Sequence, residues 1–264
     1  MKKILTNFPA PGCGPEARAT WQVPPPPVLP ANEKPKFVPS LSPHRRRSLL
    51  LTVIAALTFL SVPTPAQSVD WNTETIHCGN LIYGDNQTSV CFADTFLTDA
   101  ANATGLNIHP RFSRIALAAD EVFNTPMCIF TGEGDFVLRG SERANLRRYL
   151  ENGGFIFSSP GCSNAAWNTA FAREIALALP GYELREIPMT HELFSTVHRI
   201  PSLTVRGRTV LLQGIIINGR LALVHSPEGL NNAANAKGCC CCGGAEISQA
   251  REVNVNAVAY ALLH

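Results

Sequence analysis

Short apolar runs punctuate the chain from residue 80 onward, and each run is closed by residues that favour turns. The four runs are residues 80–84, 126–132, 155–159 and 182–188. Glycine or proline ends each of them or follows directly, so each pattern predicts a short buried strand followed by a turn.

Stretches with helical periodicity separate these runs. Apolar residues recur at spacings of three and four in residues 89–104, 164–179 and 248–263, and Ser141 is placed to cap a further helix that ends at Asn152-Gly153-Gly154. Asn254 and Asn256 are polar within the apolar last helix, so we expect one of them to bond neighbouring backbone.

The order of these segments predicts an α/β fold. Strands that alternate with helices favour a mostly parallel, doubly wound sheet with helices on both faces. Asn218-Gly219 lies between two apolar runs, residues 209–217 and 220–226, which predicts a late β-hairpin with antiparallel pairing.

Sheets of this kind bind ligands outside the carboxyl ends of their strands. Polar or reactive residues follow five of the predicted strands, and we expect them to share one rim. They are Asp85, Glu133, Ser158, Ser159, Cys162, His191 and His225.

The first 66 residues have the composition of an export leader. Residues 1–47 are basic and proline-rich, and we expect them to be disordered or to precede the true start. Three arginines then precede an apolar stretch, and Ala66 ends a signal-peptide cleavage site, so residues 48–66 predict export by the general or the twin-arginine route. The alternative is that residues 48–62 remain as a membrane anchor. The mature part, residues 67–264, reads as a single α/β domain.

Charge is divided unevenly between these parts. Residues 1–66 hold eight Lys/Arg and two Glu, whereas residues 67–264 hold fourteen Lys/Arg and eighteen Asp/Glu, so the mature part is acidic although the whole chain is +2. The longest basic cluster there is Arg147-Arg148, which excludes a nucleic-acid partner. Partners are therefore a small ligand or an envelope protein in the periplasm or outside the cell, with the membrane touched only through an uncleaved leader.

Cysteine use is the most unusual feature, because Cys239 to Cys242 stand in a row. An oxidising compartment favours disulfides, and the candidates are Cys78, Cys91, Cys128, Cys162, Cys239, Cys240, Cys241 and Cys242. Neighbours in the row lie too close to pair without strain, so their partners must come from the other four, although Cys78 and Cys91 could instead pair with each other. Alternatively, Cys239 and Cys242 have a C-x-x-C spacing and form a candidate zinc, iron or copper site, with further ligands from His191, His225 or Cys162. Redox chemistry is a third possibility.

Several segments carry a family resemblance. The strings "SERANLRRYLENGGFIF", "LPGYELREIPMTHELF", "INGRLALVHS" and "EVNVNAVAYALLH" make residues 78–264 similar to the bacterial domain of unknown function 4159. The resemblance implies a class I glutamine amidotransferase-like or flavodoxin-like fold and no established activity. Where relatives carry an acidic pair after the "GGF" strand, this chain has Ser158-Ser159, and the acid before His191 is replaced by Thr190.

Two functions follow from these observations. The first is a non-catalytic module of the cell envelope that binds a ligand or metal, or serves in assembly. The second is an amidotransferase-like hydrolase or transferase with Cys162 as nucleophile and His191 as base. We favour the first, because a complete set of nucleophile, base and orienting group cannot be assigned from the sequence.

Overall fold

The computed structural model describes residues 75–85, 92, 95–230 and 245–264. All of them belong to one compact unit, Val69–His264. The predicted leader and the four-cysteine row therefore lie outside the described residues.

Secondary structure follows the predicted alternation of strands and helices. The helices are α1 (Phe96–Thr104), α2 (Gly140–Glu151), α3 (Ala165–Ala178) and α4 (Ala250–Leu263), with short 3₁₀ turns η2 (Asp120–Asn124), η3 (Gly161–Ser163) and η4 (Glu192–Phe194). The strands are β1 (Gly79–Ile82), β2 (Ser113–Ala116), β3 (Met127–Phe130), β4 (Phe155–Ser158), β5 (Arg185–Glu186), β6 (Leu203–Val205), β7 (Arg208–Val210), β8 (Gln213–Ile217) and β9 (Arg220–His225).

Seven strands form a mixed, mostly parallel sheet in the order β2-β1-β3-β4-β9-β8-β5. The first five are mutually parallel, and β8 runs antiparallel to both β9 and β5. The predicted hairpin is confirmed, because β8 and β9 flank Asn218 and Gly219, whose φ angles of 53° and 80° suit the tight turn that Asn-Gly favours.

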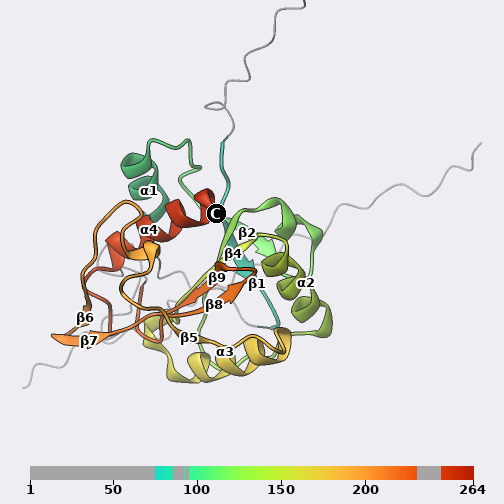
Figure 1. Cartoon of the computed structure of the whole chain (residues 1–264). Coiled ribbons are helices and arrows are strands. Elements are labelled where there is room, and N and C mark those ends of the chain that lie inside the picture. The colour runs from blue at the N-terminus through green and yellow to red at the C-terminus, as the bar shows by residue number, and fades with distance from the viewer. Residues whose placement is uncertain (1–74, 86–91, 93–94, 231–244) are drawn as a thin grey trace, which may run out of the picture. The chain divides into compact units, whose positions relative to one another are not determined.

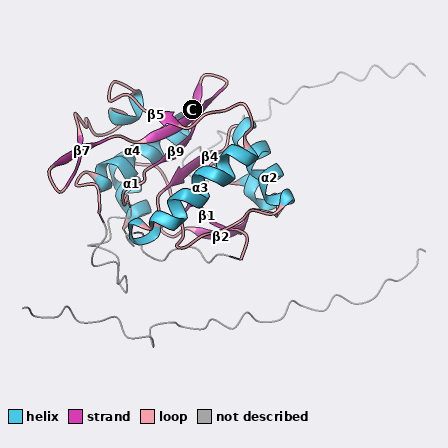
Figure 2. Cartoon of the chain, turned by 90° about the horizontal axis from the view of Figure 1, so that it is seen from below, coloured by secondary structure: helices cyan, strands magenta, loops and turns pink. Residues whose placement is uncertain are grey.

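Helices cover both faces of this sheet, as the sequence predicts. In Figure 1, α1 and α4 lie above the sheet and α3 lies below it, and Figure 2 shows α2 and α3 side by side on the same face. Each face has its own apolar core, one with residues of α1 and α4 and the other with residues of α2 and α3. We call these the α4 face and the α3 face.

Several elements differ from the sequence prediction. The run at residues 209–217 is divided between β7 and β8, and the helix predicted over residues 89–104 is observed as α1, which begins at Phe96. The run at residues 182–188 contributes only the two-residue β5, which is followed by a single further backbone bond from Ile187 N to Leu212 O. β2 and the separate β6–β7 hairpin were not predicted. The β6–β7 turn has positive φ at Arg206 and Gly207 (49° and 81°), and Arg-Gly is not a standard hairpin signal.

The predicted membrane segment, residues 48–62, lies outside the described residues. None of the helices in the described part of the chain is long and apolar enough to cross a bilayer.

Candidate functional site

The carboxyl ends of β1, β3, β4 and β9 meet at one edge of the sheet, because these strands are parallel neighbours. Most of the predicted rim residues therefore come together there. Asp85 follows β1, is fully exposed and pairs with Arg139 at 3.0 Å. Glu133 follows β3 and is also exposed. By contrast, Ser158, Ser159 and His225 are buried.

Three aligned residues at this edge face α3. Phe130 pairs in register with Ser158, and Ser158 pairs in register with His225. Ser158 Oγ lies 3.1 Å from His225 Nδ1, and the imidazole stacks on Phe171 of α3 with ring centroids 4.3 Å apart. We call Phe130, Ser158 and His225 the α3-face row.

Burial sets the charge of this row. His225 is only 2% exposed, and burial lowers the pKa of its imidazole to about 3. The ring is therefore neutral at any physiological pH, and Ser158 beside it is fully buried. Such a pair fixes two strands to α3, and its two side chains satisfy each other.

The next residue of each strand faces the opposite way, because side chains alternate along extended chain. Thr131, Ser159 and Ser226 form this second row, and all three are fully buried. The ladder continues through them, with Ser159 N donating to Phe130 O and Ser226 N to Ser158 O. We call Thr131, Ser159 and Ser226 the hydroxyl row.

Only the middle hydroxyl of this row is satisfied within the described structure. Ser159 Oγ accepts a hydrogen bond from Leu230 N (2.9 Å) and donates one to Glu228 O (3.3 Å). Thr131 Oγ1 and Ser226 Oγ are buried and have no hydrogen-bond partner in the part of the chain described. Buried polar atoms without partners are rare in native proteins, so these two call for an explanation.

A fourth polar group joins the row from α4. Asn254 is 2% exposed and its Nδ2 donates to Leu230 O at 3.0 Å, while its Oδ1 is buried and has no partner among the described groups. Asn256, two residues later, uses both ends of its amide on the backbone of residues 193–198. Both asparagines therefore bond backbone, as expected for one, but that backbone is distant in sequence.

Aromatic side chains fill the rim between β1 and β3. Trp167 Nε1 donates to Tyr83 Oη (2.7 Å), and Tyr83 Oη donates to Thr131 O (2.8 Å). Gly132 is in close contact with both rings, and a side chain there would overlap Tyr83 Oη. This part of the rim is packed by the protein itself.

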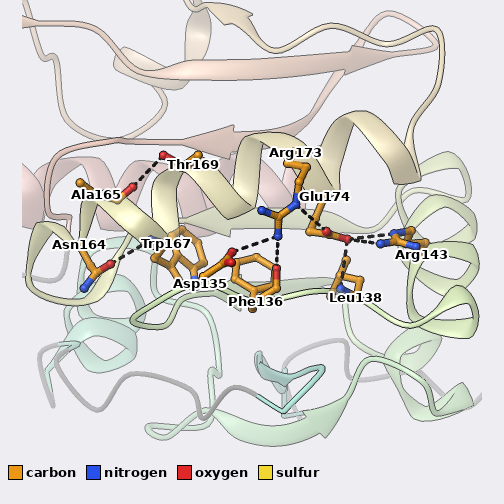
Figure 3. Close-up of polar contacts among 10 residues, drawn as sticks. All are labelled: Asp135, Phe136, Leu138, Arg143, Asn164, Ala165, Trp167, Thr169, Arg173 and Glu174. Carbon is orange, nitrogen blue, oxygen red and sulfur yellow. Dashed lines mark hydrogen bonds and ion pairs between the residues drawn. The ribbon is translucent and has the colours of Figure 1, made fainter.

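The loop between β3 and α2 is tied down on α3, as Figure 3 shows. Burial opposes ionisation of Glu174, but hydrogen bonds from Arg143 (2.7 Å), Leu138 N (3.1 Å) and Arg173 (3.1 Å) outweigh it and lower the pKa of this carboxyl. Arg173 also pairs with Asp135 at 3.1 Å. These contacts hold the loop that begins with Glu133.

His191 lies elsewhere. Its Nδ1 accepts from Leu193 N (3.1 Å), and its ring packs beside Tyr260, with centroids 5.7 Å apart. Tyr260 also contacts Phe155, the first residue of β4, so His191 lies at the opposite end of β4 from Cys162. The prediction of a shared rim therefore does not hold for His191.

A cleft lies beside His191. It has a volume of about 320 Å³ and is bordered by residues 181–183 and 185–188, Gly214, Ile216 and Leu221 at the β5 edge of the sheet. Burial lowers the pKa of His191, so its imidazole is neutral at neutral pH.

Cys162 has the backbone position that the sequence predicts, between a strand and a helix. It lies in η3, four residues after β4 ends and just before α3, which Asn164 caps by accepting from Trp167 N at 2.9 Å. Ser163 next to it has a positive φ of 52°, which is uncommon outside glycine.

The remaining cysteines give a partial answer. Cys78 and Cys128 are free, and burial raises the pKa of each thiol to about 12. They belong to the cores on opposite faces of the sheet, which explains why they do not pair. This corrects the expectation of a disulfide for these two residues. Cys91, Cys239, Cys240, Cys241 and Cys242 lie outside the described residues.

Within the described ranges, no three His, Cys, Asp or Glu side chains converge as a metal site would require. The predicted ligands Cys239 and Cys242 fall outside these ranges.

Comparison with known proteins bears on the predicted family. A search of curated proteins gives no match. The family described as "Domain of unknown function (DUF4159)" matches residues 77–262, which span every strand of the sheet and all four helices except the last residue of α4. On that match, the chain belongs to the DUF4159 family.

Proposed function

We propose that this domain is a non-catalytic ligand-binding module of the cell envelope and that the hydroxyl row is its binding site. One observation carries the proposal: three buried oxygens, on Thr131, Ser226 and Asn254, lack partners in the described structure. Each such atom costs about 1–3 kcal/mol unless something bonds it. A bound ligand would supply the missing bonds.

The position of the row supports the same proposal. The five parallel strands are ordered second, first, third, fourth, fifth, which is typical of flavodoxin-like folds. We therefore propose a flavodoxin-like fold, related to the class I glutamine amidotransferase-like domains. In such folds, ligands bind at the carboxyl ends of the strands, which is where the hydroxyl row lies.

Binding is favoured over turnover because the rim hydroxyls are poorly suited to attack a substrate. Ser158 is sealed against His225 and Phe171, and Ser159 already has a donor and an acceptor. A nucleophilic hydroxyl needs a base within reach and access to the substrate.

An amidotransferase-like enzyme remains the second proposal. It is supported by the backbone of Cys162, which follows β4 and precedes α3 with positive φ at the next residue. Its base would have to be a group other than His191, given where that ring lies. Iodoacetamide that alkylates Cys162 far faster than the other thiols would favour the enzyme over the binding module.

Two further parts of the proposal, export and metal binding, can be measured directly. Export predicts that the protein in the envelope fraction begins at Gln67, which intact-mass analysis would detect. A zinc, iron or copper ion held with Cys239 and Cys242 predicts stoichiometric metal by elemental analysis, and its absence would remove that function.

The binding proposal is tested by the stability of Thr131→Val and Ser226→Ala in ligand-free protein. Both substitutions remove an unpartnered hydroxyl with little change of volume, so each should raise the free energy of unfolding by about 0.5–1 kcal/mol. Denaturant titration of the full chain measures it. A loss of 1 kcal/mol or more in both variants would mean that the hydroxyls serve stability, for example through buried water, and would overturn the proposal.

A further inference from the structure

We infer that the hydroxyl row recognises an uncharged carboxamide group and discriminates against a carboxylate. The inference rests on the proposed function, because it names the chemistry of the ligand at that same site. It follows from the hydrogen bonds that remain open around Asn254, Thr131 and Ser226.

Asn254 is decisive because its orientation is fixed. Leu230 O can only accept a hydrogen bond, so the group of Asn254 that faces it at 3.0 Å must be the NH₂. The amide oxygen therefore points away from Leu230 O, and it is the atom that lacks a partner among the described groups. This oxygen can only accept, so the ligand must donate.

Leu230 links Asn254 to the hydroxyl row. Its N–H donates to Ser159 Oγ, while its carbonyl takes the hydrogen bond from Asn254. Ser158 lies between Phe130 and His225 in the strand register, and Thr131, Ser159 and Ser226 are the residues that directly follow these three. A hydroxyl can donate or accept, so Thr131 and Ser226 complement either end of an amide.

Charge excludes the obvious rivals. The side chain of Glu228, two residues after Ser226, pairs with Arg208 at 3.0 Å, and its backbone oxygen accepts a hydrogen bond from Ser159. Among the described side chains, no Lys or Arg bonds the row, so a carboxylate would lack a basic partner among them and would face Asn254 Oδ1 without a hydrogen to offer. An ammonium could donate, but it would be buried without a carboxylate. A carboxamide offers donors and an acceptor at no cost in charge.

The test uses acetamide, acetate and methylammonium as probes of the full chain. Nuclear magnetic resonance titrations follow the side-chain NH₂ of Asn254 and the backbone N–H of Leu230. We expect saturable shifts with acetamide and a dissociation constant at least tenfold lower than for acetate, with methylammonium between them. Tenfold is the effect of about one hydrogen bond.

Matched variants locate the effect. Thr131→Val should weaken acetamide binding at least threefold. Ser158→Ala should leave it unchanged, because Ser158 lies on the same strand ends but faces α3. Equal loss in both variants would place binding elsewhere and overturn the inference.

Each outcome separates this inference from the proposed function. Acetate binding as tightly as acetamide overturns the carboxamide inference and leaves a binding module. Binding of none of the probes, with Thr131→Val and Ser226→Ala both stabilised, also overturns the carboxamide inference alone. Binding of none, with both variants destabilised, indicates structural water and overturns both.

Discussion

The α3-face row and the hydroxyl row occupy the same three strands, one residue apart, yet they are built in opposite ways. On the α3 face, Ser158 and His225 bond each other and an aromatic ring of α3 covers them. On the α4 face, two of the three hydroxyls have no partner in the described structure. The same strands thus support a closed pair, whose two side chains bond each other, on the α3 face and buried hydroxyls without described partners on the α4 face.

The difference comes from what each helix brings to the sheet. α3 contributes Phe171 and Trp167, whose large rings exclude water and leave room only for groups that satisfy each other. α4 contributes Asn254, a polar side chain that uses one half of its amide and leaves the other. Buried polar groups that are fully hydrogen-bonded add rigidity. Those with unmet hydrogen bonds cost stability, which indicates a functional role such as ligand binding.

The largest expected effect is the loss of the imidazole on the closed side. His225→Ala removes the ring stacked on Phe171 and leaves Ser158 Oγ without its partner. We expect a loss of about 3 kcal/mol in the free energy of unfolding, from a cavity plus an unsatisfied hydroxyl. Urea denaturation measures it. If Thr131→Ala cost as much, the contrast between the two rows would be lost.

Acid should act on the same group. The pKa of His225 is lowered to about 3 in the folded protein, whereas an exposed imidazole titrates near 6.5. Below pH 6.5, the unfolded chain binds a proton that the folded chain does not, so stability falls as pH falls from about 6.5 to about 3. The expected loss between pH 7 and pH 5 is about 2 kcal/mol.

His225→Gln is the control for this pH dependence. It keeps an acceptor near Ser158 but removes the titrating group, so denaturation curves at pH 7 and pH 5 should differ less than in the parent. His191 also has a lowered pKa and contributes a smaller loss of the same sign. An unchanged pH dependence in the variant would show that His225 is not the acid-sensitive group.

Much of this fold could be predicted from the sequence, because its signals are local. Asn218-Gly219 specifies the β8–β9 turn, and Asn152-Gly153-Gly154 ends α2 where the structure ends it. β2 escaped prediction because its four residues, Ser113–Ala116, include a serine and an arginine in an edge strand. Its extended conformation comes from backbone pairing with β1, which its side-chain pattern does not indicate.

The site was less predictable, because it depends on partners. The sequence identifies the residues that follow strands. It does not show that β5 has only two residues or that His191 then packs against Tyr260, because both depend on tertiary packing. In the sequence, Thr131 lies near the end of the apolar run at residues 126–132 and has no feature that indicates a binding role. The alternation of side chains places Thr131, the residue after Phe130, on the face opposite α3. That its hydroxyl lacks a partner in the described structure can be seen only in three dimensions.

A smaller effect should appear in the direct coupling within the closed pair. A double-mutant cycle of Ser158→Ala and His225→Ala isolates their hydrogen bond of 3.1 Å. We expect a coupling of about 1 kcal/mol, as for other buried neutral hydrogen bonds. Free energies from urea titration of the four proteins give this value, and additive losses would mean that the two groups do not bond.

The smallest effect tests whether the sheet truly separates the two rows. Ser158 and Ser226 are joined through backbone, since Ser226 N donates to Ser158 O, but their side chains point to opposite faces. The cycle of Ser158→Ala and Ser226→Ala should therefore be additive within about 0.5 kcal/mol, with a loss in the first variant and a gain in the second. A coupling above 1 kcal/mol would mean that the closed side transmits strain through the strands to the hydroxyl row. The absence of coupling would leave the hydroxyl row free to change without cost to the α3 face, which is the arrangement that a binding site on a stable sheet requires.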